Sequence, residues 1–180
     1  MKNLKIALRK EIKKKINALS YEEKLRESEE IFALLEEVSH FKKAETILLF
    51  WSLPDEVFTH EFVQKWSQDK RVLLPVVVGD QLEIREFTSM ASMKIGAFGI
   101  LEPIGEKWTD MASIDLAIIP GVGFDPNGNR LGRGKGYYDK LLPSIQSPKY
   151  GICFSCQIID TIPTDEWDIT MNGIISPTKV

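Results

Sequence analysis

Four short apolar runs constrain the fold of this chain most strongly. They are TILLFW at 46–51, RVLLPVVV at 71–78, LAII at 116–119 and YGICF at 150–154. Short, nearly continuous apolar runs are typical of strands that are buried on both faces, as in parallel sheets. A helix is expected at residues 59–69, with Thr59 as its N-cap, and another at 136–142. Because strands that alternate with helices build βαβ units, we predict an α/β fold in three layers with a mostly parallel sheet.

Two amphipathic helices are expected before the first run. Ser20 and Glu23 have the spacing of a capping box, which opens the second of these helices. Apolar residues three or four apart predict one buried stripe on each helix: Leu4, Leu8, Ile12, Ile16 and Leu19 on the first, and Leu25, Ile31, Phe32, Leu35 and Val38 on the second. We therefore predict an N-terminal helical hairpin that packs on the sheet.

The remaining segments carry weaker signals. Gly79 and Asp80 predict a turn, and the alternating residues 81–87 predict a half-exposed strand after it. Residues 88–111 are rich in glycine and turn formers and are expected to be loop. Because no linker composition divides the chain, residues 1–180 are predicted to form one domain.

Composition and charge narrow the class of protein. The chain has 180 residues, 43% of them hydrophobic, and a formal net charge of -3. These values are typical of a globular domain and do not indicate a nucleic-acid partner. The charged N-terminal segment lacks the apolar core of a secretion signal, and no apolar run reaches the about 18 residues of a membrane span. We expect a soluble, cytoplasmic protein that acts as a monomer without nucleic acid or membrane.

The two cysteines, Cys153 and Cys156, form a C-x-x-C pair. Such a pair can be a redox motif or half of a zinc site. No second cysteine pair exists, and the two histidines, His40 and His60, lie far away in the sequence. The pair also falls in or beside a buried strand, where residues three apart point to opposite faces. We favour thiols that pack in the core.

A glycine-rich segment, PGVGFDPNGNRLGRGKGYYDKLL at 120–142, is the most informative motif. It follows a buried strand and precedes a helix, which is where open α/β sheets bind ligands. Glycines let backbone amides approach an anion, and Arg130, Arg133 and Lys135 add positive charge. The segment therefore predicts phosphate binding; the alternative is a mobile surface loop. It is neither a Walker A loop nor a dinucleotide-binding fingerprint, because Gly136 follows Lys135 and the glycine spacing is G-x-G-x-G.

Asp139 lies in the first turn of the helix that follows these glycines. A carboxylate there can stabilise the helix dipole. Beside bound phosphates it can instead hold magnesium, which takes one or two carboxylates together with phosphate oxygens. Both roles stay open from the residues alone.

The run NGNRLGRGKGYYDKLL at 127–142 resembles the hallmark of the 5-formyltetrahydrofolate cyclo-ligases, also called methenyltetrahydrofolate synthetases. Shorter matches follow in the same order as in that family: Lys5-x-x-x-Arg9, residues 52–59 with Asp55-Glu56-Val57, GILEP at 99–103, DLAIIPGVGF at 115–124, and residues 157–168. Trp167 stands where many members have histidine, and Asn172 stands where a second acid is common. The resemblance implies an enzyme that uses ATP and Mg²⁺ to convert 5-formyltetrahydrofolate to 5,10-methenyltetrahydrofolate, with release of ADP and phosphate.

The resemblance also implies roles for individual residues. Arg133 and Lys135 would be catalytic, Asp139 and Asp168 would bind Mg²⁺, and Glu56 would accept hydrogen bonds from the pterin. Trp51 could stack on the pterin or pack in the core. The ATP-binding residues would be Lys5, Arg9, Arg130, Leu131, Gly132, Arg133, Gly134, Lys135, Gly136, Tyr137 and Tyr138, and those that bind the folate would be Trp51, Glu56, Arg133, Gly134, Lys135, Gly136 and Tyr137.

Two other classes of protein would use the same loop. One is a module that binds a nucleotide or a phosphosugar without turnover. The other is a sugar-phosphate isomerase, which needs a general base beside the phosphate site. Asp125 is the acid within the loop that could serve as that base.

Overall fold

The computed structural model describes residues 1–96 and 99–177. Its central sheet has six strands in the order β10 (Gly173–Ile175), β9 (Lys149–Ile152), β6 (Leu116–Ile119), β1 (Thr46–Leu48), β2 (Arg71–Val78) and β3 (Gln81–Phe87). Neighbouring strands are parallel, except for the antiparallel pair β2–β3. That hairpin turns at Gly79, whose φ of +61° suits glycine. The expected mostly parallel sheet is confirmed.

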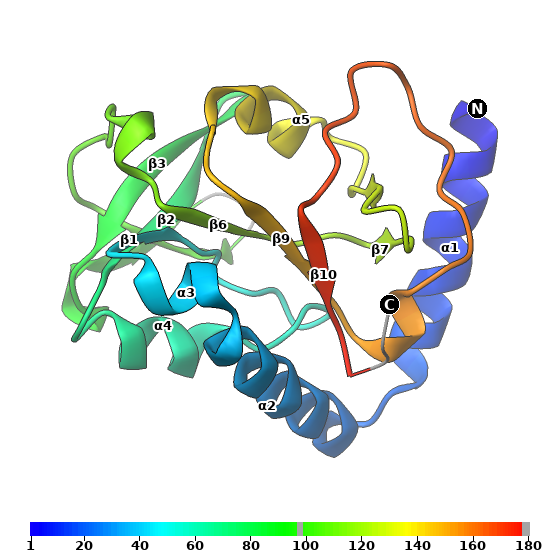
Figure 1. The fold of residues 1–180 in the computed structure, drawn as a ribbon, viewed down its shortest axis with the longest axis horizontal. Coiled ribbons are helices and arrows are strands. Elements are labelled where there is room, and N and C mark those ends of the chain that lie inside the picture. The colour runs from blue at the N-terminus through cyan, green and yellow to red at the C-terminus, as the bar shows by residue number, and fades with distance from the viewer. Residues whose placement is uncertain (97–98, 178–180) are drawn as a thin grey trace.

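Helices cover the sheet on both faces (Figure 1). They are α1 (Lys2–Ala18), α2 (Tyr21–Glu37), α3 (Ser39–Lys43), α4 (His60–Trp66) and α5 (Tyr137–Leu141), with short 3-10 turns η1 (Met90–Ser92), η3 (Met111–Ser113), η4 (Leu142–Ser144) and η5 (Ser155–Gln157). Figure 1 shows α2, α3 and α4 gathered on one side of the molecule, α5 at its opposite end, and α1 along one flank. Within the part of the chain that the structure describes, no helix has both the length and the apolar character to cross a bilayer.

Two apolar clusters fill the spaces on either side of the sheet, which makes the molecule three layers thick. Successive residues of β1 take opposite sides: Ile47 belongs to the cluster with α1, α2, α3 and α4, whereas Leu48 belongs to the cluster with α5 and η4. This alternation follows from the period of two in a strand. It explains why the strand sequences are continuous in apolar residues, since both of their faces are buried.

The expected helical hairpin is confirmed. Its second helix opens with a capping box, in which the Glu23 N–H donates to Ser20 Oγ at 3.1 Å and the Ser20 N–H donates to Glu23 Oε2 at 2.7 Å. Ile12 and Ile16 of the first helix are buried. Leu4, which was expected on the same stripe, is 56% exposed because the first turns of α1 extend past the core.

Several expected boundaries and elements differ from the structure. β1 ends at Leu48 and is therefore shorter than its apolar run at 46–51. β9 covers Lys149–Ile152, so it begins one residue before its apolar run at 150–154 and ends two residues before the end of that run. The segment 88–111 contains a small antiparallel sheet of β4 (Met93–Ile95) and β5 (Leu101–Pro103), where only loop was expected. β10 was not predicted, because three residues carry no readable periodicity. Thr59 takes the N-cap position of α4 but makes no cap bond; its hydroxyl donates to the Phe50 carbonyl at 2.6 Å.

The order of the strands fixes where a ligand can bind. From β1 the chain passes through α4 to β2 on one side, and it later returns to β6 on the other side. The carboxyl ends of β1 and β6 therefore diverge at a topological switch point, the usual ligand position in open α/β sheets.

Candidate functional site

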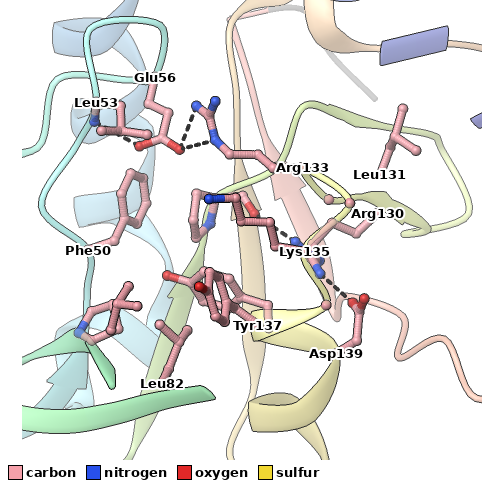
Figure 2. A pocket seen from close by; sticks show the side chains of 18 of the residues that line it. Phe50, Leu53, Glu56, Leu82, Arg130, Leu131, Arg133, Lys135, Tyr137 and Asp139 are labelled. Carbon is pink, nitrogen blue, oxygen red and sulfur yellow. Dashed lines mark hydrogen bonds and ion pairs between the residues drawn. The ribbon is translucent and has the colours of Figure 1, made fainter. Parts of the chain in front are cut away.

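A cavity of about 500 Å³ opens at this switch point (Figure 2). Phe50, Trp51, Leu53 and Glu56 follow β1 into it, and Pro120 and Gly121 follow β6. Every residue for which the family resemblance implies a site role lines this one cavity: Lys5, Arg9, Trp51, Glu56, Arg130, Leu131, Gly132, Arg133, Gly134, Lys135, Gly136, Tyr137, Tyr138, Asp139 and Asp168. The fold thus brings together residues from both ends of the chain and from its middle.

The glycine-rich segment is an organised structure and not a featureless loop. It begins with a two-stranded antiparallel ribbon of β7 (Gly123–Phe124) and β8 (Arg130–Leu131). At the turn, Gly128 has a φ of +82°, and a Cβ there would lie 2.6 Å from the Met171 carbonyl oxygen. The glycine therefore lets the C-terminal segment fold back against the loop. This fold-back is what brings Asp168 to the cavity that Asp139 also lines.

Asp125 anchors the same ribbon and is fully buried. Its Oδ1 accepts the N–H groups of Asn127 and Asn129, and its Oδ2 accepts the Ile162 N–H and the Asn129 side-chain amide, all at 2.9–3.0 Å. An ionised carboxylate offers about four lone-pair sites, so this one is saturated. A saturated, buried carboxylate cannot reach a substrate proton, which argues against the isomerase alternative.

Arg130 is fixed in the wall of the cavity. Its side chain is only 6% exposed, and it donates to the Pro120 carbonyl at 3.2 Å and to Asp139 Oδ1 at 2.7 Å. The guanidinium carbon lies 5.4 Å from the centre of the Tyr138 ring. Burial raises the pKa of Tyr138, so its hydroxyl stays protonated. Arg130 and Asp139 therefore form an ion pair at the cavity wall.

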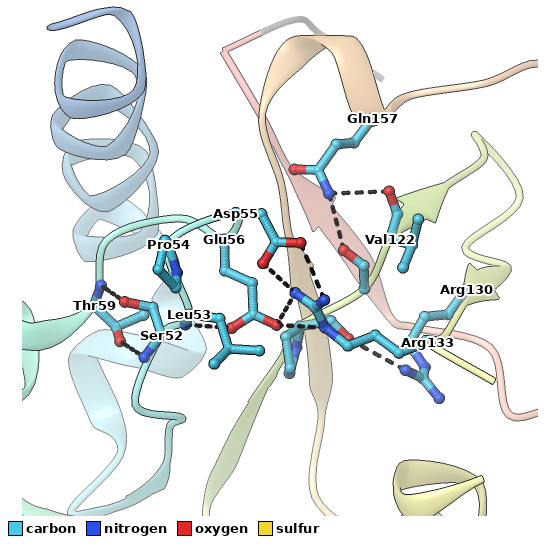
Figure 3. Close-up of polar contacts among 12 residues, drawn as sticks. Ser52, Leu53, Pro54, Asp55, Glu56, Thr59, Val122, Arg130, Arg133 and Gln157 are labelled. Atoms are coloured by element: carbon cyan, nitrogen blue, oxygen red, sulfur yellow. Dashed lines mark hydrogen bonds and ion pairs between the residues drawn. The ribbon is translucent and has the colours of Figure 1, made fainter. Parts of the chain in front are cut away.

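Arg133 extends from the glycine loop across to the loop after β1 and so bridges the two (Figures 2 and 3). It donates to Asp55 Oδ1 and Oδ2 at 2.7 and 3.1 Å, and to Glu56 Oε1 at 2.9 and 3.2 Å. Burial raises the pKa of Glu56, although the Arg133 charge opposes the rise. Burial also acts to raise the pKa of Asp55, but the hydrogen bonds from Arg133 outweigh it and the pKa is lowered.

A pair of hydrogen bonds shapes the loop that carries these two acids. The Ser52 N–H donates to Thr59 Oγ1 and the Thr59 N–H donates to Ser52 Oγ, each at 3.0 Å (Figure 3). Within the loop, the Leu53 N–H donates to Glu56 Oε2 at 2.9 Å. Glu56 is therefore held from inside its own loop, with its other oxygen turned toward Arg133.

Lys5 and Arg9 do not form a solvated face, unlike the exposed lysines elsewhere on α1. Lys5 Nζ lies 3.0 Å from both Asp165 Oδ2 and Asp168 Oδ2, and Arg9 Nε donates to the Gly132 carbonyl at 2.7 Å. The i, i+4 spacing points both side chains at the cavity. Helix α1 is thus tied to the glycine loop and to the C-terminal segment at the mouth of the cavity.

Trp51 combines the two roles that the sequence left open. Its ring stacks on His60 at 4.0 Å between centroids and 10° between planes, and it packs against the core cluster. It also lines the cavity. Burial lowers the pKa of His60, so the ring that supports Trp51 is neutral at physiological pH.

Three polar residues of this site, Asp55, Glu102 and Asp165, are not among the predicted site residues. Asp55 belongs to the family-like segment 52–59, and its position next to Glu56 in the loop that follows β1 is the signal that could have found it. Glu102 lines the cavity, is only 4% exposed, and accepts a hydrogen bond from the Val77 N–H at 3.2 Å. Asp165 forms an ion pair with Lys5. Glu102 and Asp165 fall within the family-like segments 99–103 and 157–168, but nothing marks them individually, because their positions depend on how distant segments pack.

The carboxylates present suit magnesium when phosphates supply its other ligands. Asp139 and Asp168 both line the cavity. No cluster of three or more His, Cys, Asp or Glu side chains suited to a metal occurs among residues 1–96 and 99–177. Mg²⁺ needs no such cluster, since it is usually held by one or two carboxylates plus substrate phosphates and water. Asn172 takes no part: its Oδ1 accepts the Lys149 N–H at 2.8 Å at the start of β9.

The two cysteines stay apart from this chemistry. Cys153 is fully buried in the cluster beside α5, and Cys156 packs against the cluster on the other face. Burial raises the pKa of both thiols. Cys153 is fully buried, Cys156 is half-buried, and a raised pKa keeps both thiols protonated and poorly reactive, which supports the prediction of core thiols.

The fold and the cavity together define a three-layer α/β protein with a glycine- and arginine-lined site at the switch point of its sheet. The sequence matches the model of the 5-formyltetrahydrofolate cyclo-ligase family over residues 1–177. It is 30% identical over 187 residues to 5-formyltetrahydrofolate cyclo-ligase of Mus musculus, which covers 95% of this chain and 92% of the mouse protein. The chain belongs to this family and is a ligase.

Two solved structures have the same fold. The NMR structure of 5,10-methenyltetrahydrofolate synthetase from Aquifex aeolicus matches with a TM-score of 0.87 and 36% identity, over 96% of this chain and 89% of that one. The 5,10-methenyltetrahydrofolate synthetase from Mycoplasma pneumoniae matches with a TM-score of 0.76 and 31% identity, over 95% and 97% of the two chains. The architecture of this chain is therefore that of the family.

Proposed function

We propose that this protein catalyses the ATP- and magnesium-dependent cyclisation of 5-formyltetrahydrofolate to 5,10-methenyltetrahydrofolate, with release of ADP and phosphate. The observation that carries the proposal is one cavity that joins two kinds of group. One wall carries the glycines and cations of residues 130–136, and the other carries the Glu56 carboxylate beside Trp51. The first set suits phosphates, and the second suits a flat heterocycle with adjacent N–H donors.

The chemistry needs an activated oxygen. The formyl group on N5 is an amide, and its oxygen leaves poorly. The formyl oxygen attacks the γ-phosphorus of ATP, the bond from that phosphorus to the β-bridging oxygen breaks, and ADP leaves. N10 then attacks the formyl carbon, the carbon–oxygen bond breaks, phosphate leaves, and the N10 proton is lost. The product is the five-membered methenyl ring.

The protein contributes position and charge to these steps. Phosphoryl transfer depends mainly on alignment and charge stabilisation. Arg133 and Lys135 would stabilise the transferring phosphoryl group, while Lys5, Arg9 and the backbone of residues 130–138 would hold the rest of the nucleotide. Glu56 would orient the pterin by accepting hydrogen bonds from its amine and its ring N–H, and Trp51 would face the pterin ring.

Asp139 and Asp168 would hold Mg²⁺ against the phosphates. When bound, the ion would neutralise phosphate charge and so make the γ-phosphorus easier to attack. Arg130 would keep Asp139 turned to the cavity, and Lys5 would do the same for Asp168, since each cation contacts one oxygen of its partner. Both acids are then positioned before any ligand arrives.

A direct assay tests the proposal. The purified protein is incubated with ATP, Mg²⁺ and 5-formyltetrahydrofolate, and the near-ultraviolet absorbance of the methenyl product is followed. The expected result is a rise in absorbance that requires all three components and is matched by ADP release. Nucleotide binding without this absorbance change would instead support a binding module without turnover.

A further inference from the structure

The guanidinium of Arg133 has almost no donors left for a phosphate. It carries five N–H groups. Nε and Nη2 donate to Glu56 Oε1, and Nη1 and Nη2 donate to Asp55, at distances of 2.7–3.2 Å. One N–H, on Nη1, is outside these bonds. A two-pronged grip on a phosphate needs two parallel donors, so Arg133 cannot provide it in this arrangement.

Glu56 is in the complementary position. Its Oε1 accepts both bonds from Arg133, and its Oε2 accepts the Leu53 N–H at 2.9 Å. With about four lone-pair sites on a carboxylate, one site remains. A ligand with two adjacent N–H donors needs both oxygens, and therefore has to displace at least one of the bonds from Arg133.

We propose that Glu56 caps the Nε–Nη2 edge of Arg133 in the substrate-free protein, and that a pterin bound to Glu56 uncaps that edge for the transferring phosphoryl group. Asp55 holds the Nη1–Nη2 edge throughout and acts as a positioning residue for Arg133. The inference rests on the proposed function, because it takes the two ligands from there. It adds that the folate subsite and the phosphate subsite share one group.

The exposures of the three side chains indicate which side of the contact is held more tightly by its surroundings. The side chain of Glu56 is 10% exposed and that of Asp55 is 23% exposed, whereas that of Arg133 is 40% exposed. The acids also lie in a loop closed by the Ser52–Thr59 pair of hydrogen bonds. The carboxylates therefore form the fixed side of the contact, and the guanidinium shifts away from Glu56 while Asp55 keeps its Nη1–Nη2 edge.

A measurable coupling between the two substrates follows. If folate uncaps Arg133, folate tightens nucleotide binding, and nucleotide tightens folate binding by the same factor. Because hydrogen bonds to charged groups are individually strong, we expect a factor of about ten. Folate and nucleotide that bound side by side without sharing Arg133 would show a factor near one.

Calorimetric titration with the β,γ-imido analogue of ATP and Mg²⁺, with and without 5-formyltetrahydrofolate, tests the cap. In Glu56→Gln, the amide has one acceptor oxygen for two sets of donors, so the cap on Arg133 is weakened. We expect this variant to bind the nucleotide alone about tenfold more tightly than the native protein, and to lose the enhancement by folate. A gain in affinity is not expected of a residue that only supports the fold.

Glu102→Gln is the matched control, because Glu102 is a second buried carboxylate of the same cavity and its carboxylate accepts from Val77. It should keep the folate enhancement and show no such gain, which separates the cap from the general removal of negative charge. Nucleotide affinity in Glu56→Gln that equals or falls below the native value would overturn the inference. In that case the absorbance assay of the native protein still reports on the proposed function, and a native protein that binds no nucleotide would overturn both.

Asp55→Asn tests the positioning role. With the Nη1–Nη2 edge released, we expect kcat to fall by about tenfold or more while the KM for the folate changes by less than about twofold. A residue with only a structural role would lower the fraction of folded protein and leave kcat per folded molecule unchanged. An unchanged kcat would remove Asp55 from the proposal.

Discussion

Replacing Asp125 with asparagine should destabilise the protein severely without touching its chemistry. Asp125 is fully buried, and all four of its hydrogen bonds run to N–H donors: two to Oδ1 and two to Oδ2. Asparagine has the same shape, but it replaces one acceptor oxygen with an NH₂ group. Two of the four donors then face another donor.

The expected loss can be worked out from these bonds. Hydrogen bonds to a charged group contribute about 1.5–3 kcal/mol each, so the loss of two costs about 3–6 kcal/mol. Domains unfold with about 5–15 kcal/mol in total, so this is a large share of the stability. With a urea m-value of about 2 kcal/mol per M, the unfolding midpoint should fall by about 1.5–3 M.

Urea unfolding followed by circular dichroism measures this change. Asp69→Asn serves as control, because Asp69 is an exposed carboxylate, and its effect should stay within about 0.5 kcal/mol. Turnover of Asp125→Asn, measured without urea and corrected for folded protein, should remain close to native. A variant as stable as the native protein would refute the count of bonds, and a stable variant without turnover would show that Asp125 takes part in the reaction.

Four further outcomes are expected. Arg133→Ala should lower turnover by about 100-fold or more, and Arg133→Lys should recover only part of it because the planar fork is lost. Burial raises the pKa of Glu56, and the folate contact needs its carboxylate form, so kcat/KM for the folate should begin to fall at a higher pH than it would with an ordinary glutamate. Arg133→Ala removes the charge that opposes this rise, so the fall in kcat/KM should move to a still higher pH. Replacing both cysteines with serine should lower the unfolding temperature and leave kcat per folded molecule nearly unchanged, with no zinc released. In magnesium titrations of the rate, Asp139→Asn should raise the requirement strongly and Asp168→Asn more weakly; curves that match the native protein would remove both as ligands.

The sequence predicted the parts of this protein whose signals are local. The capping box at Ser20 and Glu23 is a four-residue pattern, and the structure forms it. The turn at Gly79 and Asp80 between β2 and β3 depends on residues next to one another in the chain. The continuous apolar runs identified strands buried on both faces, because such runs leave no face for water.

The glycine-rich segment was also readable, since its glycines and cations are contiguous. Its place after β6 followed from the βαβ pattern. The resemblance of residues 127–142 to one family then supplied distant partners, such as Lys5 and Asp168, that no spacing could have provided.

Only the tertiary structure decided how these residues pair. Arg133 was expected to face phosphate, and the structure places it against Asp55 and Glu56, which lie far from it in the sequence. Asp125 was one candidate base by its position in the loop, and the fold saturates it with N–H donors. The physical reason is that hydrogen bonds and ion pairs act over about 3 Å between atoms. Whether two residues reach that distance depends on how the sheet, the helices and the C-terminal segment pack around the cavity. The order of residues along the chain does not show this packing.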